Sequence, residues 1–473
     1  MEQVDGRTHV NTAGEARPQA LWVFIGVSVF ALAGTRLASI AVPWYVLTTT
    51  GSPTLTGLVA FAEMAPYVVV KALAGPWIDR VGPVRVSILS AAASALAVAA
   101  VPLLHGSGLL GYPALVVLVA LIGIFRAPGD GAKVTLIPMV AKASGSTLER
   151  VSGAFGAVDR LAATLGAAFG GLVIAVVGGA NALWLTVGTF ALDALLLALV
   201  LTPMLAGTDL RAPRGDAGTS YSGELREGWQ FLRGDSVLVS IVAMLAVTNM
   251  LEQAFGVALV PVWAMQTGGG PGAIGLLFAT AAAFSVAGAM IAAALGERLP
   301  RRPVYVFAYL LVGVPRFAVL ALGAPLPVAL AVLAVTGLAT GFINPIIGAV
   351  VVERIPGRLM GRVNTLAMAC AWALLPFGGL VGGLLVTAVG LSTALWIVAG
   401  FYLVVTMSPT LLPAWKHIER GSVVRPDSPG SAAPMSESQT PAESESPARD
   451  DVRPGSSRVR GSRPARRARS PRP

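Results

Sequence analysis

The sequence predicts an all-α integral membrane protein with twelve transmembrane helices in two six-helix pseudo-repeat halves. Three observations predict this class: the composition, the spacing of apolar runs and the alternation of charge between loops. Hydrophobic residues make up 55% of the 473-residue chain, and charged residues only 12%. A soluble domain carries about 25% charged residues, so this composition excludes an ordinary soluble enzyme.

Apolar runs of the length that crosses a membrane occur twelve times. A hydrocarbon core about 30 Å thick takes about 20 helical residues. The first run is too long for the apolar part of a secretory signal, so we expect it to be retained as a helix. The twelve expected spans are 21–45, 55–75, 84–104, 112–133, 149–177, 182–204, 236–262, 272–295, 303–322, 326–350, 360–386 and 390–413.

Loop charge predicts the orientation of these spans. The loops after spans 1, 3, 5, 7, 9 and 11 contain no Lys, Arg, Asp or Glu, and the loops between the others hold fifteen Lys and Arg, Lys133 among them. Positive charge accumulates in cytoplasmic loops. We therefore expect both termini to be cytoplasmic and the protein to lie in a bacterial cytoplasmic membrane.

An internal repeat supports the division into two halves. A shift of 212 residues superposes the end of the first six spans on the end of the second six without a gap. The matches are Arg150 on Arg362, Gly166 on Gly378, Gly170–Leu172 on Gly382–Leu384, Gly178 on Gly390, and Ala182–Trp184 on Ala394–Trp396. Two such halves place a substrate site between them, near the middle of the membrane.

The predicted organisation has five parts. They are a cytoplasmic N-terminal segment (1–20), the first six-helix half (21–204), a cytoplasmic linker (205–235), the second half (236–413) and a basic tail (414–473). In the linker, Leu225, Trp229 and Leu232 have helical spacing, which predicts an amphipathic helix at the inner membrane surface. The Ser-, Pro- and Arg-rich tail is expected to be disordered.

The tail also accounts for the basic net charge. Eight arginines and no acid lie in residues 453–473, and they supply +8 of the formal +10. We therefore expect no nucleic-acid partner. The single cysteine and three scattered histidines have no metal-ligand spacing, and no metal or catalytic site is predicted.

The turn between spans 2 and 3 carries the motif with the most specific resemblance. It reads GPWIDRVGPVRV and resembles the inner-loop motif of the major facilitator superfamily, with Pro83 and Val84 where the family prefers basic residues. The matching residues are Gly75, Asp79, Arg80, Gly82 and Arg85. The resemblance implies a conformational latch in which Asp79 approaches residues 360–364.

Two further resemblances point to export. The sequence GAAFGG in span 5 (Gly166, Gly170 and Gly171) is similar to the glycine-rich antiporter signature of the family, with Ala167 in place of its proline. Stretches such as FRAPGDGAKVTLIPMV and ERIPGRLMGRVNTL resemble the drug- and macrolide-efflux and siderophore-export-like branch. No phosphate-binding G-x-x-x-x-G-K-[ST] sequence occurs, so we expect no ATPase subunit, no cofactor, and an ion gradient as energy source.

Ionisable residues inside the spans are the candidate site. Each costs about 2.5–3.5 kcal/mol near the membrane centre unless it has a partner or a wet cavity. In the family, spans 1, 4, 7 and 10 line the central cavity, and span 10 offers only the neutral Thr336, Thr340 and Asn344. The charged residues are Arg36, Glu63, Arg126, Asp130, Asp159, Arg160, Asp193, Glu252 and Arg316.

The depths of Arg36 and Glu63 suggest that these two residues can meet. Such an ion pair fixes spans 1 and 2, or it takes part in transport. Asp159, Arg160 and Asp193 fall near the middle of spans 5 and 6, where pairing between helices is the simpler interpretation. The sequence offers no account of Arg316.

Glu252 is the sharpest candidate for a proton or substrate site. With Asn249 and Gln253 it forms one polar face of span 7, and no basic residue lies in that span to neutralise it. A poorly solvated carboxyl holds a proton more readily than one in water. Glu252 is therefore either a proton carrier or cation site, or the buried half of a structural pair.

These observations predict a secondary active transporter that exports a small hydrophobic or amphiphilic molecule, a drug or metabolite, by proton antiport. The alternatives are a siderophore or other metabolite exporter, or an uptake symporter. A membrane-embedded transferase needs a catalytic group of His and acid residues in a loop, which the loops do not offer. We expect a monomer whose partners are its small-molecule substrate and membrane lipid.

Overall fold

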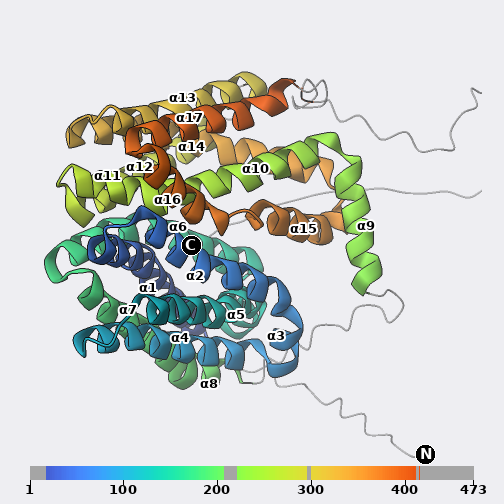
Figure 1. The fold of residues 1–473 in the computed structure, drawn as a ribbon. Helices are drawn as coiled ribbons and strands as arrows, with labels where there is room; N and C mark the ends of the chain where they lie inside the picture. Colours follow the sequence, from blue (N-terminus) through green and yellow to red (C-terminus); the bar gives the residue numbers. More distant parts are fainter. Residues whose placement is uncertain (1–16, 207–220, 296–299, 412–414, 416–473) are drawn as a thin grey trace, which may run out of the picture. The chain divides into compact units, whose positions relative to one another are not determined.

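The computed structural model describes residues 17–206, 221–295, 300–411 and 415, and their regular structure is entirely helical (Figure 1). Among these residues, eleven helices are long and apolar enough to cross a membrane. The twelfth span is α6, which is 30 residues long and carries charged residues in its first half. The predicted class, twelve helices in two halves, is confirmed. Residues 207–220 of the linker and the tail apart from Trp415 lie outside the described residues.

The N-terminal half consists of six spans and a short connecting helix. The span that begins with α7 continues through a π-helical turn into α8. The bounds are α1 (Gln19–Thr50), α2 (Pro53–Leu73), α3 (Gly75–Val81), α4 (Pro83–Gly106), α5 (Tyr112–Ser144), α6 (Leu148–Val177), α7 (Gly179–Leu196), η1 (Leu197–Leu201) and α8 (Thr202–Leu205). The connecting helix is α3.

The C-terminal half repeats this arrangement with two irregular spans. Its first span has a π-helical turn between α10 and α11, and its fifth is broken between α15 and α16. The bounds are α10 (Ser236–Ala254), η2 (Phe255–Leu259), α11 (Val260–Gln266), α12 (Gly270–Leu295), α13 (Arg301–Ala321), α14 (Leu326–Arg354), α15 (Met360–Trp372), α16 (Phe377–Val389) and α17 (Leu391–Met407).

The backbone follows the predicted 212-residue repeat. Shifting α6 by 212 residues places it on 360–389, the range from the start of α15 to the end of α16. The turn after each of these spans is made by a glycine in nearly the same conformation, Gly178 at φ 83° and ψ 160° and Gly390 at φ 79° and ψ 162°. A positive φ favours glycine, so the repeated glycines mark a repeated turn.

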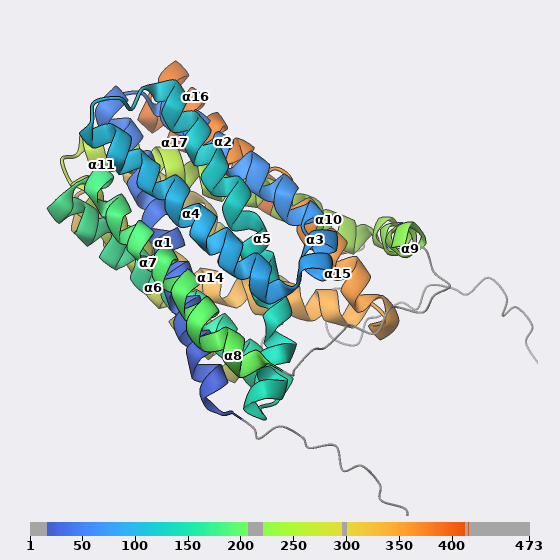
Figure 2. The same cartoon turned by 90° about the horizontal axis from the view of Figure 1, so that it is seen from below.

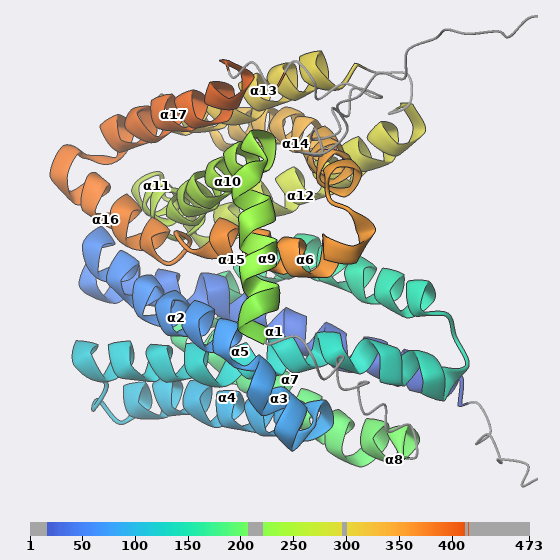
Figure 3. The same cartoon turned by 90° about the vertical axis from the view of Figure 1, so that its right-hand side faces the viewer.

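Helix α9 (Tyr221–Gly234) lies across the charged end of the bundle, where the loops carry Lys and Arg (Figures 1 and 3). Its Leu232 is buried in an apolar cluster with Leu238, Ile355 and Val363. Arg362 of α15 also donates a hydrogen bond to Glu227 at 2.9 Å. The side chain of the predicted Leu225 lies outside the described residues, but Leu232 anchors this helix to the C-terminal half.

At the opposite, uncharged end, α16 lies against α2 (Figures 1 and 2). A Cβ atom on Gly383 would collide with α2 and one on Gly378 with α10, while a Cβ atom on Gly379 or Gly382 would be tightly packed, at 3.0 Å from Ala60 and 3.1 Å from Ala254. Four glycines thus let α16 fit between two helices at backbone distance, as small residues do in membrane helices. The Thr54 and Thr387 hydroxyls are also 2.8 Å apart across this contact.

The predicted antiporter-like glycines occupy the equivalent places in α6. Gly166 and Gly170 face α1, and Gly171 meets the backbone of α12 at Pro271 and Gly275. Each of these glycines is the repeat partner of one in α16. Two pairs of helices, α2 with α16 and α6 with α12, therefore join the halves by the same kind of close packing.

Candidate functional site

A cavity of about 580 Å³ lies between the two halves. Helices α1 and α2 line it from one half, and α10, α12, α13, α14 and α17 from the other. Its surface is mostly apolar, with Phe255, Phe278 and Leu333 among the lining residues. The predicted Thr336, Thr340 and Asn344 line it too. The predicted Arg126 and Asp130 are not among its lining residues.

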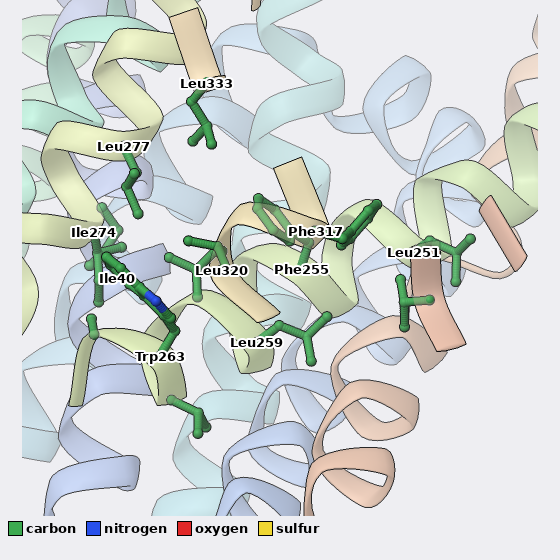
Figure 4. Close-up of a cluster of buried hydrophobic side chains, with 14 of the residues drawn as sticks. Ile40, Leu251, Phe255, Leu259, Trp263, Ile274, Leu277, Phe317, Leu320 and Leu333 are labelled. Carbon is green, nitrogen blue, oxygen red and sulfur yellow. The ribbon is translucent and has the colours of Figure 1, made fainter. Parts of the chain in front are cut away.

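Apolar side chains of the two halves also pack against each other beside the cavity. Ile40 of α1 lies beside Trp263 of α11 and Ile274 of α12 (Figure 4). All three are at least nine-tenths buried. This contact joins the two halves, because Ile40 belongs to the N-terminal half and the other two residues belong to the C-terminal half.

Glu252 lines the cavity and is paired with Arg316, whose role could not be predicted from the sequence. The guanidinium of Arg316 donates two hydrogen bonds to the carboxylate, at 2.6 and 2.8 Å. The Glu252 side chain is 43% exposed, whereas that of Arg316 is 10% exposed. The carboxylate therefore faces the cavity, and its counter-ion lies behind it.

Three aromatic rings surround the Arg316 guanidinium. Its central carbon lies 5.1 Å from the ring centre of Phe255, 4.6 Å from that of Phe317 and 4.7 Å from that of Tyr402. Ring faces attract a cation, and more strongly where water is excluded. The rings and the bidentate carboxylate together hold Arg316 in one orientation.

The other two residues of the predicted polar face contact the broken span. Asn249 donates a hydrogen bond of 2.9 Å from its side-chain amide to the carbonyl of Ala371, next to the last residue of α15. Gln253 lies against α16 at Gly378. A helix that breaks inside a membrane frees carbonyl groups that need new donors. Asn249 supplies one of them, while both residues also line the cavity.

A second charged cluster lies in the N-terminal half, behind the cavity wall. Arg126 of α5 donates a hydrogen bond to Glu63 of α2 at 2.7 Å and lies 3.8 Å from Asp130. The Tyr67 hydroxyl donates to Asp130 at 2.9 Å, and its ring lies under the Arg126 guanidinium at 4.7 Å. Two carboxylates therefore share one arginine, and Glu63 is the member that lines the cavity.

The expected pairing of Arg36 with Glu63 is wrong. Arg36 instead lies 3.4 Å from Asp159 of α6, and the two side chains are 39% and 49% exposed. Depth along a span indicates which residues share a layer, but it does not indicate which way each helix face points.

The assignment of Lys133 to a loop is also wrong. Helix α5 ends at Ser144 rather than at 133, because an apolar run marks only the part of a helix that lies in hydrocarbon. Lys133 is buried and donates a hydrogen bond to Asp193 of α7 at 2.7 Å. Asp193 is thus paired between helices, but with a residue of span 4 rather than with one of spans 5 and 6.

The predicted latch motif lies on α3 and the turn after it. Gly82 has a φ of 95°, a value that favours glycine. Asp79, Arg80 and Arg85 are exposed. Gly75 has an ordinary φ and open space around its Cβ position, and packing gives no reason for a glycine there.

Comparison with known families identifies one match. The family described as Major Facilitator Superfamily matches residues 24–260 and 242–454. These two ranges cover most of both halves.

Curated relatives include proteins named multidrug efflux pump Tap. The one from Mycobacterium tuberculosis is 32% identical over 373 residues, 78% of this chain and 88% of the relative. The one from Mycolicibacterium fortuitum is 30% identical over 405 residues, 85% of this chain and 98% of the relative.

Solved structures share the fold at low sequence identity. A mutant of the nucleoside transporter NupG is 14% identical and has a TM-score of 0.67, covering 83% of this chain and 99% of its own. At this identity the likeness concerns the fold alone.

Proposed function

Because this chain belongs to the Major Facilitator Superfamily, we propose that it is a secondary transporter that exports small hydrophobic or amphiphilic compounds from a bacterial cell in exchange for protons. The observation that carries this proposal is the mostly apolar cavity of about 580 Å³ between the halves, with the Glu252 carboxylate facing into it. The relatives named as multidrug efflux pumps support export as the direction.

The distribution of charge supports a cytoplasmic location for the α9 end. Loops there hold the Lys and Arg that accumulate on the cytoplasmic side, and both termini then lie inside the cell. With this orientation the end joined by α2 with α16 and α6 with α12 faces outward. The described conformation then suits loading of substrate from the cytoplasm or the inner leaflet. Both walls of the cavity come from one chain, so a monomer suffices.

We assign substrate recognition to the side of the cavity that Glu252 lines. Of the charged pair, the acid is the more exposed, so a molecule bound on this side meets a carboxylate, while Arg36 lines the wall that α1 forms. Aromatic and aliphatic residues such as Phe255, Phe278 and Leu333 form the neighbouring wall. This combination favours compounds with an apolar body and a cationic group, because the carboxylate and the ring faces both attract a cation.

We assign the proton site to Glu63 and Asp130. Arg126 contacts both acids, and the second cation of the cluster, Lys71, reaches Asp130 only through the Tyr67 hydroxyl. A like charge nearby favours protonation of one member of such a pair. Glu252 differs, because its bidentate contact with Arg316 leaves no surplus charge. We therefore assign the proton to the Glu63 and Asp130 pair.

Transport of ethidium into everted membrane vesicles tests the proposal. An acid interior is imposed on vesicles that contain the full chain, and ethidium fluorescence is followed. We expect accumulation that collapses when the proton gradient is dissipated. Glu63→Gln combined with Asp130→Asn is expected to abolish driven accumulation, whereas Lys142→Arg, at an exposed residue in the last turn of α5, serves as the control.

Two results would contradict the proposal. One is accumulation that requires ATP after the gradient is removed, which would indicate an ATPase partner. The other is ethidium leaving preloaded vesicles under the same gradient, which would indicate uptake rather than export.

A further inference from the structure

One charged side chain extends from the N-terminal charge cluster to the other half of the molecule. Lys71 lies in the last turn of α2, and its ammonium is 4.5 Å from the ring centre of Trp372. Trp372 belongs to α15 in the C-terminal half. A cation this close to the face of an indole ring is attracted to it.

The same ammonium is connected to the proton site. Lys71 donates a hydrogen bond to the Tyr67 hydroxyl at 3.0 Å, and that hydroxyl donates to Asp130 at 2.9 Å. Asp130 lies 3.8 Å from Arg126, which binds Glu63. A continuous series of contacts thus runs from Trp372 in one half to the two acids in the other.

The position of Trp372 makes this contact sensitive to movement between the halves. It is the last residue of α15, immediately before the break at 373–376 that separates α15 from α16. Asn249 of α10 holds the carbonyl of the preceding Ala371, which fixes this end of α15 to the C-terminal half. Helix α16, beyond the break, packs on α2. Relative movement of the halves therefore acts at this break.

The other charged groups around Asp130 that the structure describes belong to the N-terminal half. Glu63 lines the cavity, whereas Arg126, Lys133 and its partner Asp193 line a small space beside Asp130. Their distances from Asp130 are set within one half. Lys71 differs from them because a ring of the opposite half contributes to holding its ammonium in place.

We propose that Lys71 is the positioning residue that couples the protonation of the Glu63 and Asp130 pair to the relative position of the two halves. While Trp372 holds the ammonium, the cluster contains two cations and two acids, and both acids are ionised. When the halves move and Trp372 withdraws, the ammonium is less tightly held, and one carboxylate takes up a proton. This inference rests on the proposed proton antiport.

The proposed direction agrees with export. In the cytoplasm-facing conformation, the Lys71–Trp372 contact favours release of the proton to the cytoplasm. In the outward-facing conformation, its loss favours proton uptake from outside. Each cycle then carries a proton inward, as antiport against an exported compound requires.

A double-mutant cycle tests the coupling. The full chain is purified in detergent, and the protons released on binding of ethidium are measured with a pH indicator as a function of starting pH. The variants are Lys71→Met, Trp372→Leu and the two together. We expect each single change to shift the pH midpoint of release upward by about half a unit, because a cation near the acids is lost or loosened. The double variant should match Lys71→Met alone.

Conservative variants distinguish a positioning role of Lys71 from a purely structural contact with Trp372. Lys71→Arg and Trp372→Phe keep a cation and a ring, and we expect their midpoints to return toward that of the unchanged chain. A purely structural contact would lower the melting temperature of the variants and leave the midpoint in place. That result, or two shifts that simply add, would overturn the proposal.

The failure of the underlying function is distinguishable from the failure of this inference. If the unchanged chain binds ethidium but releases no proton, the proton antiport itself is wrong and the coupling falls with it. If the unchanged chain releases protons and the three variants release them at the same midpoint, only the role of Lys71 is overturned.

Discussion

In the N-terminal half Arg126 is shared by Glu63 and Asp130, whereas in the C-terminal half Arg316 is bound by Glu252 alone. The exposure of the acids differs as well. The Glu63 side chain is 11% exposed and lies at the edge of a buried cluster, while that of Glu252 is 43% exposed to the cavity. Two acids that share one directly bound arginine suit reversible protonation, and a bidentate pair with an open carboxylate suits recognition. The two halves thus use similar residues for different tasks.

The largest expected effect comes from removing the only counter-ion of a buried arginine. Glu252→Gln leaves Arg316 buried with three rings and no carboxylate, and breaking such a pair costs about 3–5 kcal/mol. Glu63→Gln leaves Arg126 with Asp130, so the loss should be about 1 kcal/mol. Thermal unfolding in detergent measures both. Equal losses would show that Asp130, at 3.8 Å, does not compensate Arg126.

A smaller difference is expected from removing a cation. Arg126→Leu leaves two acids close together, and Arg316→Leu leaves one acid that water in the cavity can reach. At neutral pH, where both acids are ionised, we expect Arg126→Leu to lose about 2 kcal/mol more stability than Arg316→Leu. The first variant should regain stability as the pH falls, because protonation relieves the unpaired charge. Stability of Arg316→Leu should depend less on pH. The opposite order would contradict the assignment of the proton to Glu63 and Asp130.

The smallest expected effect concerns two tyrosines whose rings lie under the two arginines. Tyr67→Phe and Tyr402→Phe keep both rings, at 4.7 Å from their guanidinium carbons. Each should cost only about 0.6 kcal/mol, the average for a membrane hydrogen bond. Tyr67→Phe should nevertheless move the pH midpoint of proton release, since its hydroxyl joins Lys71 to Asp130. Tyr402→Phe should leave that midpoint unchanged.

The sequence predicts the helices far better than the contacts between them. Apolar runs and loop charge indicate the number of spans, and a repeated turn glycine such as Gly390 indicates the two halves. The ends of helices are harder to predict, because hydropathy marks only the part of a helix that lies in the hydrocarbon core. Lys133 was misassigned for that reason.

The pairing of buried charges was the least predictable feature. Arg36 and Glu63 share a depth, yet each pairs with another helix. The partner of Glu252 could in part have been predicted. Span 7 contains an acid and no base, span 9 contains a base and no acid, and Glu252 and Arg316 lie at similar depths in these spans. That prediction requires knowledge of which helices are neighbours, and neighbourhood is set by packing of small residues over the whole bundle.

Proton release at saturating ethidium is the most direct test of the two assignments. These assign the proton to Glu63 and Asp130, and the substrate contact to Glu252. The purified full chain and its variants are mixed with ethidium, and binding and released protons are measured together. We predict that Glu63→Gln with Asp130→Asn binds ethidium and releases no proton, while Glu252→Gln binds about tenfold more weakly, the effect of about 1.4 kcal/mol, and still releases protons once saturated. Loss of release in Glu252→Gln, with normal release in the other variant, would contradict the account and identify Glu252 as the proton carrier.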